Sequence, residues 1–212
     1  MDDPWVMYYV VRKDVPLTVE HAMALAGAAA VRCRDRFADD PDHREAFAAW
    51  HERPRKVALR ASAGELERFG GVLLETEAGP TLRALPPCRR SSAPEHLAAL
   101  RPYTDPPRKG ALEAPGARPA LRFVTREGVL RTTGKAMAQA GHAALLAAEE
   151  LAPRHPEAFA AWRAAGCPAV LEVVDAERWE AVRADPDAVV VADAGLTQVA
   201  PGTETVAALP PR

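Results

Sequence analysis

The chain has 212 residues, of which 48% are hydrophobic and 26% are charged, a composition typical of a folded globular protein. Its formal net charge of −2 gives no general attraction for nucleic acid, so any RNA contact would have to come from a local basic patch. The first residues, MDDPWVMYYVV, are acidic where a secretion signal would be basic, and no apolar run approaches the roughly 18 residues that span a membrane. We therefore expect a cytoplasmic protein with no membrane contact.

The three cysteines, Cys33, Cys88 and Cys167, lie far apart and in no CxxC spacing. An odd number of widely separated cysteines indicates neither a disulfide framework nor a zinc site. We expect buried or incidental thiols and no metal.

An internal repeat organises the sequence. Residues 10–30 align without a gap with residues 124–144 at an offset of 114, and eleven of the 21 columns are identical. The motif EAFAAW then occurs in both halves, at Glu45–Trp50 and at Glu157–Trp162. Because the later elements also keep their order, we interpret the chain as a tandem duplication with copies at residues 4–88 and 119–212.

The first copy is predicted to contain a strand, a long helix, a second helix, a strand, a helix, a strand, a turn and a strand. The stretch 86–119 that follows holds eight of the 20 prolines, which favours an extended linker over residues 89–118, with one helical turn at PEHLAAL. The linker could also add basic contacts to RNA through Arg89, Arg90, Arg108 and Lys109.

The second copy begins with ALRFVT, whose alternating pattern predicts a strand. Thr132 or Thr133 can cap a helix that runs to about Leu151, before Pro153. The stretch HPEAFAAWRAAG predicts a second helix closed by Gly166.

The remaining elements of the second copy alternate between strand and helix. AVLEVV and AVVVAD are predicted strands, and AERWEAVRA between them is a predicted crossover helix. This alternation predicts an α/β domain with a mostly parallel sheet, to which TETVAALPP would return as an edge strand.

Three polar side chains stand out in the alanine-rich helix start GKAMAQAGHA: Lys135, Gln139 and His142. They lie at 0°, about 40° and about −20° around a helix axis, so they share one face. Functional groups of α/β sheets gather at strand ends and helix starts. This face and the turn DAGLTQVAPGT are therefore the two candidate site segments.

Together these segments resemble the type 2 peptidyl-tRNA hydrolase family, whose helix begins GK-x-A-A-Q-x-x-H-A and whose late turn reads DAG-x-T-Q-(I/V)-APG-(S/T)-x-T. The resemblance covers residues 119–212. It implies a small three-layer α/β/α domain with a four-stranded mixed sheet. It also implies hydrolysis, without a metal or a cofactor, of the ester that joins a peptide to the terminal ribose of tRNA.

The resemblance further implies which residues act. His142 and Asp193 could form a proton-handling pair, with Lys135 as the donor to an oxyanion or a phosphate and Thr197 positioning water or ribose. Which residue is the base stays open. The implied substrate-binding residues are Arg131, Thr132, Thr133, Gly134, Gln139 and Gln198.

One part of the family pattern is missing. The family usually has a further Gly-Lys just before the helix lysine, and this chain has Thr132 and Thr133 there. One cation for phosphate is thereby lost, which Arg131, Arg126 or Arg122 could replace.

The first copy lacks the polar face. The positions of Lys135, Gln139 and His142 are taken there by His21, Leu25 and Ala28, and in the turn Glu77, Thr81 and Leu82 align with Asp193, Thr197 and Gln198. We expect no catalysis from this copy. We expect it to pack on the second as a pseudo-dimer within a monomeric chain.

Two functions follow as alternatives. The first is the hydrolysis of peptidyl-tRNA to recycle tRNA. The second is a non-catalytic tRNA-binding or protein-interaction module that has kept the fold. Release of N-acyl-amino acid from N-acyl-aminoacyl-tRNA would distinguish them.

Overall fold

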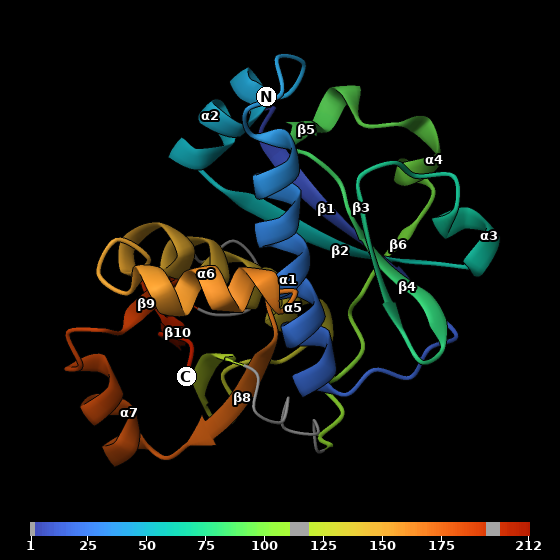
Figure 1. Cartoon of the computed structure of the whole chain (residues 1–212). Helices are drawn as coiled ribbons and strands as arrows, with labels where there is room; N and C mark the ends of the chain where they lie inside the picture. The colour runs from blue at the N-terminus through green and yellow to red at the C-terminus, as the bar shows by residue number, and fades with distance from the viewer. Residues whose placement is uncertain (1–2, 111–118, 194–199) are drawn as a thin grey trace.

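The computed structural model of the chain describes residues 3–110, 119–193 and 200–212. It is a mixed α/β structure with two sheets (Figure 1). We call residues 3–110 the first unit and residues 119–212 the second unit. That these units are separate domains with the predicted bounds stays a prediction.

The first unit contains a six-stranded sheet in the order β3-β4-β1-β2-β6, with β5 paired to β1. Its strands are β1 (Trp5–Arg12), β2 (Arg55–Ala61), β3 (Val72–Thr76), β4 (Gly79–Ala84), β5 (Cys88–Arg89) and β6 (Arg101–Pro102). Its helices are α1 (Val19–Phe37), α2 (Arg44–Glu52), α3 (Ala63–Leu66), the 3-10 turn η1 (Arg90–Ser92) and α4 (Glu95–Ala98).

The second unit contains a four-stranded sheet in the order β8-β7-β10-β9. Its strands are β7 (Leu121–Arg126), β8 (Ala169–Val174), β9 (Val189–Ala192) and β10 (Glu204–Leu209). Its helices are α5 (Thr133–Leu146), which continues as the π-helix η2 (Ala147–Leu151), then α6 (Pro156–Ala164) and α7 (Ala176–Arg183).

The two units share one topology. The order β3-β4-β1-β2 matches β9-β10-β7-β8, and in each unit the first two strands are parallel while the last strand runs antiparallel to the first. The expected four-stranded sheet is confirmed in the second unit, whereas the first has two additional strands. That the units arose by duplication stays a prediction.

Three expectations about the strands were wrong. The sheet of the second unit is not mostly parallel, because β7 and β8 are parallel but β10 runs antiparallel to both β7 and β9. The C-terminal strand β10 lies inside the second sheet, between β7 and β9, and not at its edge. The proline-rich stretch is not only extended chain, because it contributes β5 and β6 to the first sheet. The single helical turn expected at PEHLAAL is confirmed as α4.

The start and end of α5 follow the sequence signals. Thr132 is the N-cap, and its hydroxyl accepts a hydrogen bond from the Lys135 backbone N–H at 3.3 Å. This side-chain acceptor satisfies one of the N–H groups that a helix start leaves unpaired. The helical path ends at Leu151 through η2, as predicted. Thr18 caps α1 in the same way.

Helices α1 and α5 pack against each other between the two sheets (Figure 1). Two glycines make the close approach possible. A Cβ atom on Gly27 of α1 would lie 2.8 Å from Phe123 Cζ of β7, and one on Gly141 of α5 would lie 2.0 Å from the Tyr9 hydroxyl oxygen of β1. Each helix thus receives an aromatic ring from the other unit where a side chain would otherwise stand.

One hydrophobic core joins both units, because its buried residues come from α1, α5 and the facing sides of both sheets. The outer side of the first sheet packs on Leu66 of α3 and Leu97 of α4. The outer side of the second sheet packs on Trp179 and Val182 of α7. The two sheets therefore share a single inner layer of helices.

Two smaller features concern the helices and the cysteines. In the described ranges no helix is both long and apolar enough to cross a bilayer. Cys33 and Cys167 are buried free thiols, and Cys88 is half-buried.

Candidate active site

Lys135 and Gln139 of α5 converge on Asp193, which directly follows β9. The Lys135 ammonium and the Gln139 amide both donate to the same oxygen, Asp193 Oδ2. The Lys135 side chain is 12% exposed and that of Asp193 is 4% exposed. Two opposite charges are therefore buried together, and an amide also donates to the carboxylate, in keeping with the rule that buried charges are paired and hydrogen-bonded.

Main-chain hydrogen bonds hold the backbone of Asp193 in place. Its N–H donates to the Thr203 carbonyl at 2.8 Å, and its own carbonyl accepts from the Gly202 N–H at 2.8 Å. These bonds close the loop between β9 and β10 at its base. The carboxylate thus stands at a strand end, opposite the first turns of α5, as the sequence predicts for a site in an α/β fold.

His142 is not brought to Asp193. Within the described ranges no hydrogen bond or ion pair joins the two side chains, so the geometry gives no support to the predicted proton-handling pair. Burial, together with the charges of Lys56 and His51, lowers the pKa of His142 from 6.5 to about 3. His142 belongs to the surface of α5 that meets the first unit, and it is neutral at neutral pH.

The start of α5 is covered by the segment 103–110, which we call the strap. The Thr133 N–H donates to the Asp105 carbonyl at 2.9 Å, and the Gly134 N–H donates to the Tyr103 carbonyl at 3.0 Å. The Thr133 hydroxyl also reaches the Asp105 carbonyl, at 3.3 Å. Substrate could contact these backbone groups only if the strap left, whereas Arg131, just before the cap, is exposed.

Sequence reasoning missed the strap because its contacts with the start of α5 are made by backbone carbonyls. A carbonyl oxygen is present at every residue, so it leaves no signal in the sequence. Two further predicted site residues, Thr197 and Gln198, lie outside the described residues. In the described ranges no group of three or more His, Cys, Asp or Glu side chains is placed to hold a metal.

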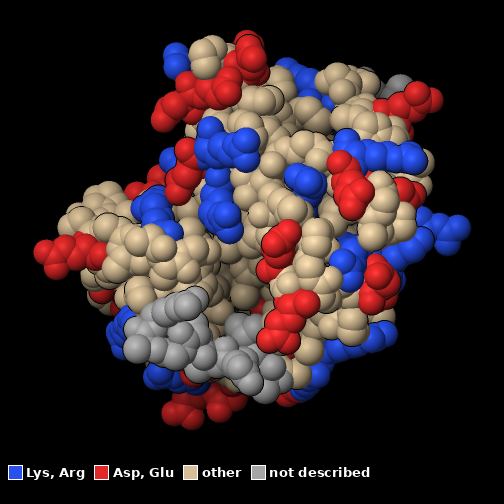
Figure 2. Space-filling view, turned by 45° about the vertical axis from the view of Figure 1, so that its right-hand side comes forward, with Lys and Arg blue, Asp and Glu red and all other residues tan. Residues whose placement is uncertain are grey.

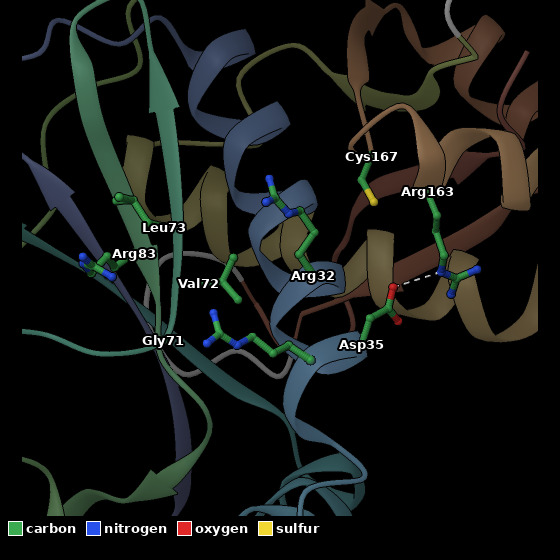
Figure 3. Close-up of a pocket in the computed structure, with 9 residues that line it drawn as sticks. Arg32, Asp35, Gly71, Val72, Leu73, Arg83, Arg163 and Cys167 are labelled. Atoms are coloured by element: carbon green, nitrogen blue, oxygen red, sulfur yellow. Dashed lines mark hydrogen bonds and ion pairs between the residues drawn. The ribbon is translucent and has the colours of Figure 1, made fainter.

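A cavity of about 560 Å³ lies elsewhere, between α1, β3 and the end of α6 (Figure 3). It contains none of the predicted site residues. Arg83 and Leu73 point away from α1 in Figure 3, and the Arg83 Nε donates to the Leu66 carbonyl at 3.1 Å. Arg163 is paired with Asp35 at 3.0 Å. The cavity therefore has fewer available cations than its arginines suggest.

Comparison with known proteins relates the second unit to a known family. Residues 120–212 match the family model described as peptidyl-tRNA hydrolase PTH2. The chain is also 30% identical over 115 residues to a human protein named peptidyl-tRNA hydrolase 2, mitochondrial, an alignment that covers 51% of this chain and 64% of the human one.

Strand register places the PTH2 turn relative to the first unit. Val10 of β1 faces Arg83, and its counterpart Val124 of β7 faces Ala207. Arg83 in turn faces Leu73, and Ala207 faces Val190. Leu73 and Val190 are therefore equivalent. Counting three residues along each strand makes Thr76, and not Glu77, the counterpart of Asp193.

The same register corrects the predicted match of Thr81. Leu82 is equivalent to Val206, so Thr81 corresponds to Thr205 of β10 and not to Thr197 of the PTH2 turn. Only Glu77 and Ala78 connect β3 to β4 in the first unit, whereas residues 193–203 connect β9 to β10. The first unit lacks this loop altogether.

Charge is evenly distributed on the face of the molecule that Figure 2 shows. Basic and acidic side chains are interspersed there, and the described residues form no continuous basic surface on that face. A nucleic acid would therefore have to be recognised at this face through local contacts.

Proposed function

We propose that the second unit hydrolyses the ester bond of peptidyl-tRNA and so recycles tRNA. The observation that carries the proposal is the buried contact of Lys135 and Gln139 with Asp193. These residues occupy positions of the PTH2 sequence pattern, and residues 120–212 match the model of that family. The chain covers 64% of the human relative, and the activity named for that protein is proposed here for the second unit.

The chemistry of ester hydrolysis fits these three side chains. The reaction needs a group that accepts a proton from the attacking water and a donor that stabilises the oxyanion. The Asp193 carboxylate can accept the proton, and the Lys135 ammonium can donate to the oxyanion or to the terminal phosphate. Gln139 holds the carboxylate in place. Because the group is buried, its charges are oriented before the substrate arrives, which is the condition for a large electrostatic effect.

The geometry favours Asp193 over His142 as the base. Asp193 lies beside the Lys135 ammonium, whereas His142 lies near Lys56 and His51 of the first unit, and a general base must lie within hydrogen-bond reach of the proton that it abstracts. We assign to His142 the role of a packing residue beside the first unit. His142→Asn should then lower kcat far less than Asp193→Asn does.

We further infer that residues 4–88 and 119–212 pack as an intramolecular pseudo-dimer, joined by residues 89–118. The reciprocal contacts support this: Gly27 with Phe123, and Gly141 with Tyr9. Gly27 and Gly141 occupy equivalent positions, as do Tyr9 and Phe123, so the two contacts are related as they would be by a two-fold axis. The first unit then serves as a permanent partner that covers the side of α5 on which Gly141 lies.

The test is the release of labelled N-acetyl-amino acid from N-acetyl-aminoacyl-tRNA by the purified full chain. We expect release that is lost in Lys135→Ala and in Asp193→Asn. The alternative, a non-catalytic tRNA-binding module, is favoured by the strap that covers the helix start. Absence of release at high protein concentration, with tRNA binding retained, would establish that alternative.

A further inference from the structure

We propose that Arg60, in β2 of the first unit, is a positioning residue for the candidate site. It holds the strap on the first turn of α5 and thereby fixes the backbone from which Lys135 projects. The inference rests on the proposed function for its kinetic test, whereas its structural test does not depend on that function.

The Arg60 guanidinium joins three segments of the chain. Its Nη1 is 2.6 Å from Asp105 Oδ2 in the strap, and its Nη2 donates to the Lys13 carbonyl at 2.8 Å. Its Cζ lies 5.1 Å from the centre of the Tyr103 ring. A planar, forked cation can make a charged hydrogen bond, a second bond and a ring contact together, which a lysine ammonium cannot.

The strap transmits this restraint to α5. The Tyr103 N–H donates to the Ala58 carbonyl of β2 at 2.9 Å, and the Tyr103 carbonyl accepts from the Gly134 N–H at 3.0 Å. A Cβ atom on Gly134 would lie 2.4 Å from that carbonyl oxygen, so only glycine permits this contact. Lys135 is the next residue. Its backbone is therefore one peptide bond away from a direct link to the first unit.

The strap also crosses the start of α1. The Arg108 carbonyl accepts from the Val19 N–H at 2.7 Å, in the same way that the Asp105 carbonyl accepts from Thr133. Four N–H groups at a helix start lack a partner within the helix, and the strap supplies acceptors to both helices. One segment thus sets the two helix starts relative to each other.

The second unit has no counterpart of Arg60 and the strap among the described residues. By strand register Arg60 corresponds to Val173 of β8, which is 47% exposed. β6 pairs with β2, whereas in the described ranges no strand pairs with the outer edge of β8. Arg60 and the strap therefore act on the unit that contains Lys135 and Asp193, and the second unit offers no equivalent in return.

The kinetic test compares Arg60→Ala, Asp105→Ala and the double variant in the full chain. We expect kcat to fall roughly 10-fold in each single variant, because small displacements of a catalytic group cost large factors in rate, while KM changes less than about 2-fold. The double variant should be no worse than Arg60→Ala, since that change already breaks the ion pair with Asp105. Arg101→Ala, which removes an exposed arginine of β6, is the matched control and should keep the parent kcat.

A milder variant guards against misfolding. Asp105→Asn keeps the strap carbonyl and the shape of the side chain while weakening the ion pair, so kcat should fall only about 3-fold at an unchanged melting temperature. A fall in the amount of folded protein alone would leave kcat per folded molecule unchanged, and that result would contradict a positioning role.

Hydrogen exchange gives a readout that needs no activity. The Thr133 and Gly134 amides should be protected in the parent chain and should exchange at least about 10-fold faster in Arg60→Ala, while amides of α7 stay unchanged. Unchanged exchange would overturn the proposal even if the chain proves to be a hydrolase. A rise in kcat/KM or in tRNA affinity would also overturn it, because the strap would then be a cover over the site.

Discussion

The two units share the strand order β3-β4-β1-β2 and β9-β10-β7-β8. They differ where the start of the long helix faces the end of the edge strand. In the second unit, Lys135 of α5 reaches across to Asp193 at the end of β9. In the first unit, His21 stands at the equivalent helix position and bonds its own cap, with 2.9 Å between His21 Nδ1 and the Thr18 hydroxyl. Thr76 replaces the carboxylate, and its hydroxyl lies 2.8 Å from that of Thr81.

The difference separates what the fold needs from what the site needs. The reciprocal contacts of Gly27 and Gly141 are kept in both units, because both helices must approach closely to form the shared core. The ion pair between the helix start and the strand end, Lys135 with Asp193, is described in the second unit, and the equivalent His21 and Thr76 do not form one. The core therefore does not depend on that contact, and a unit can keep its packing without a site.

The strongest test of this comparison is to remove the polar side chains at the helix start and the strand end from each unit in turn. Lys135→Ala and Asp193→Asn should each lower kcat/KM by roughly 10²-fold or more, the range for loss of one preorganised group. The matched first-unit variants, His21→Ala and Thr76→Ala, should change it less than about 2-fold. Steady-state hydrolysis of N-acetyl-aminoacyl-tRNA is the measurement. Equal losses from both units would refute the assignment of the site to the second.

The glycine contacts test the symmetric part of the comparison. Gly141→Ala should destabilise the chain by about 1–3 kcal/mol, since overpacking costs this much and the added Cβ would lie 2.0 Å from the Tyr9 hydroxyl oxygen. Gly27→Ala should cost less, because its nearest atom is 2.8 Å away. Denaturant unfolding measures both. Tyr9→Phe should partly rescue Gly141→Ala, and failure to rescue would place the strain elsewhere.

His142 on α5 makes the stability of the chain depend on pH. The unfolded chain binds a proton at His142 with a pKa near 6.5, whereas the folded chain does so only at about 3. Stability contributed by the neutral ring is therefore complete above pH 6.5 and is lost as the pH falls towards 3. We expect a loss of about 1–2 kcal/mol between pH 6.5 and 5, measured by denaturant unfolding.

His142→Ala, which copies Ala28 of the first unit, should remove this part of the pH dependence. His21→Ala in α1 is the matched control. Identical acid sensitivity in the parent and in His142→Ala would show that the other titrating groups account for all of it.

The smallest expected effect concerns the one polar atom in the reciprocal contact. The Tyr9 hydroxyl is buried and has no hydrogen-bond partner among the described residues. Tyr9→Phe, which copies Phe123, should stabilise the chain by up to about 1 kcal/mol, because it removes an unsatisfied buried group. Phe123→Tyr should do the reverse. Thermal unfolding resolves the pair, and a clear loss of stability in Tyr9→Phe would mean that the hydroxyl is hydrogen-bonded after all.

Local signals predicted the second unit well. A threonine before an alanine-rich run predicts a capped helix, and Thr132 is that cap. Alternating strands and helices predicted the α/β class. The approach of Lys135 and Gln139 to Asp193 could be expected from the family pattern, because a helix start and a strand end meet at one edge of the sheet.

Features that depend on distant pairing could not be predicted. EAGPT at residues 77–81 resembles DAGLT at residues 193–197, so matching by letters equated them. Yet Gly79, at φ 81°, begins β4 directly after the two-residue turn of Glu77 and Ala78. Strand order, the burial of His142 and the contacts of the strap depend on pairings far apart in sequence, which periodicity does not encode.

The contact between α1 and α5 has a consequence for how the chain must fold. Gly27 and Gly141 are 114 residues apart, so the shared core forms only after both units have been synthesised. Contacts of such long range slow folding and leave apolar surface exposed in the meantime. While the ribosome is making the second unit, the side of α1 that packs on α5 is still uncovered. Once α5 arrives, neither helix can leave without exposing the core of both sheets, and the two units gain or lose their structure together.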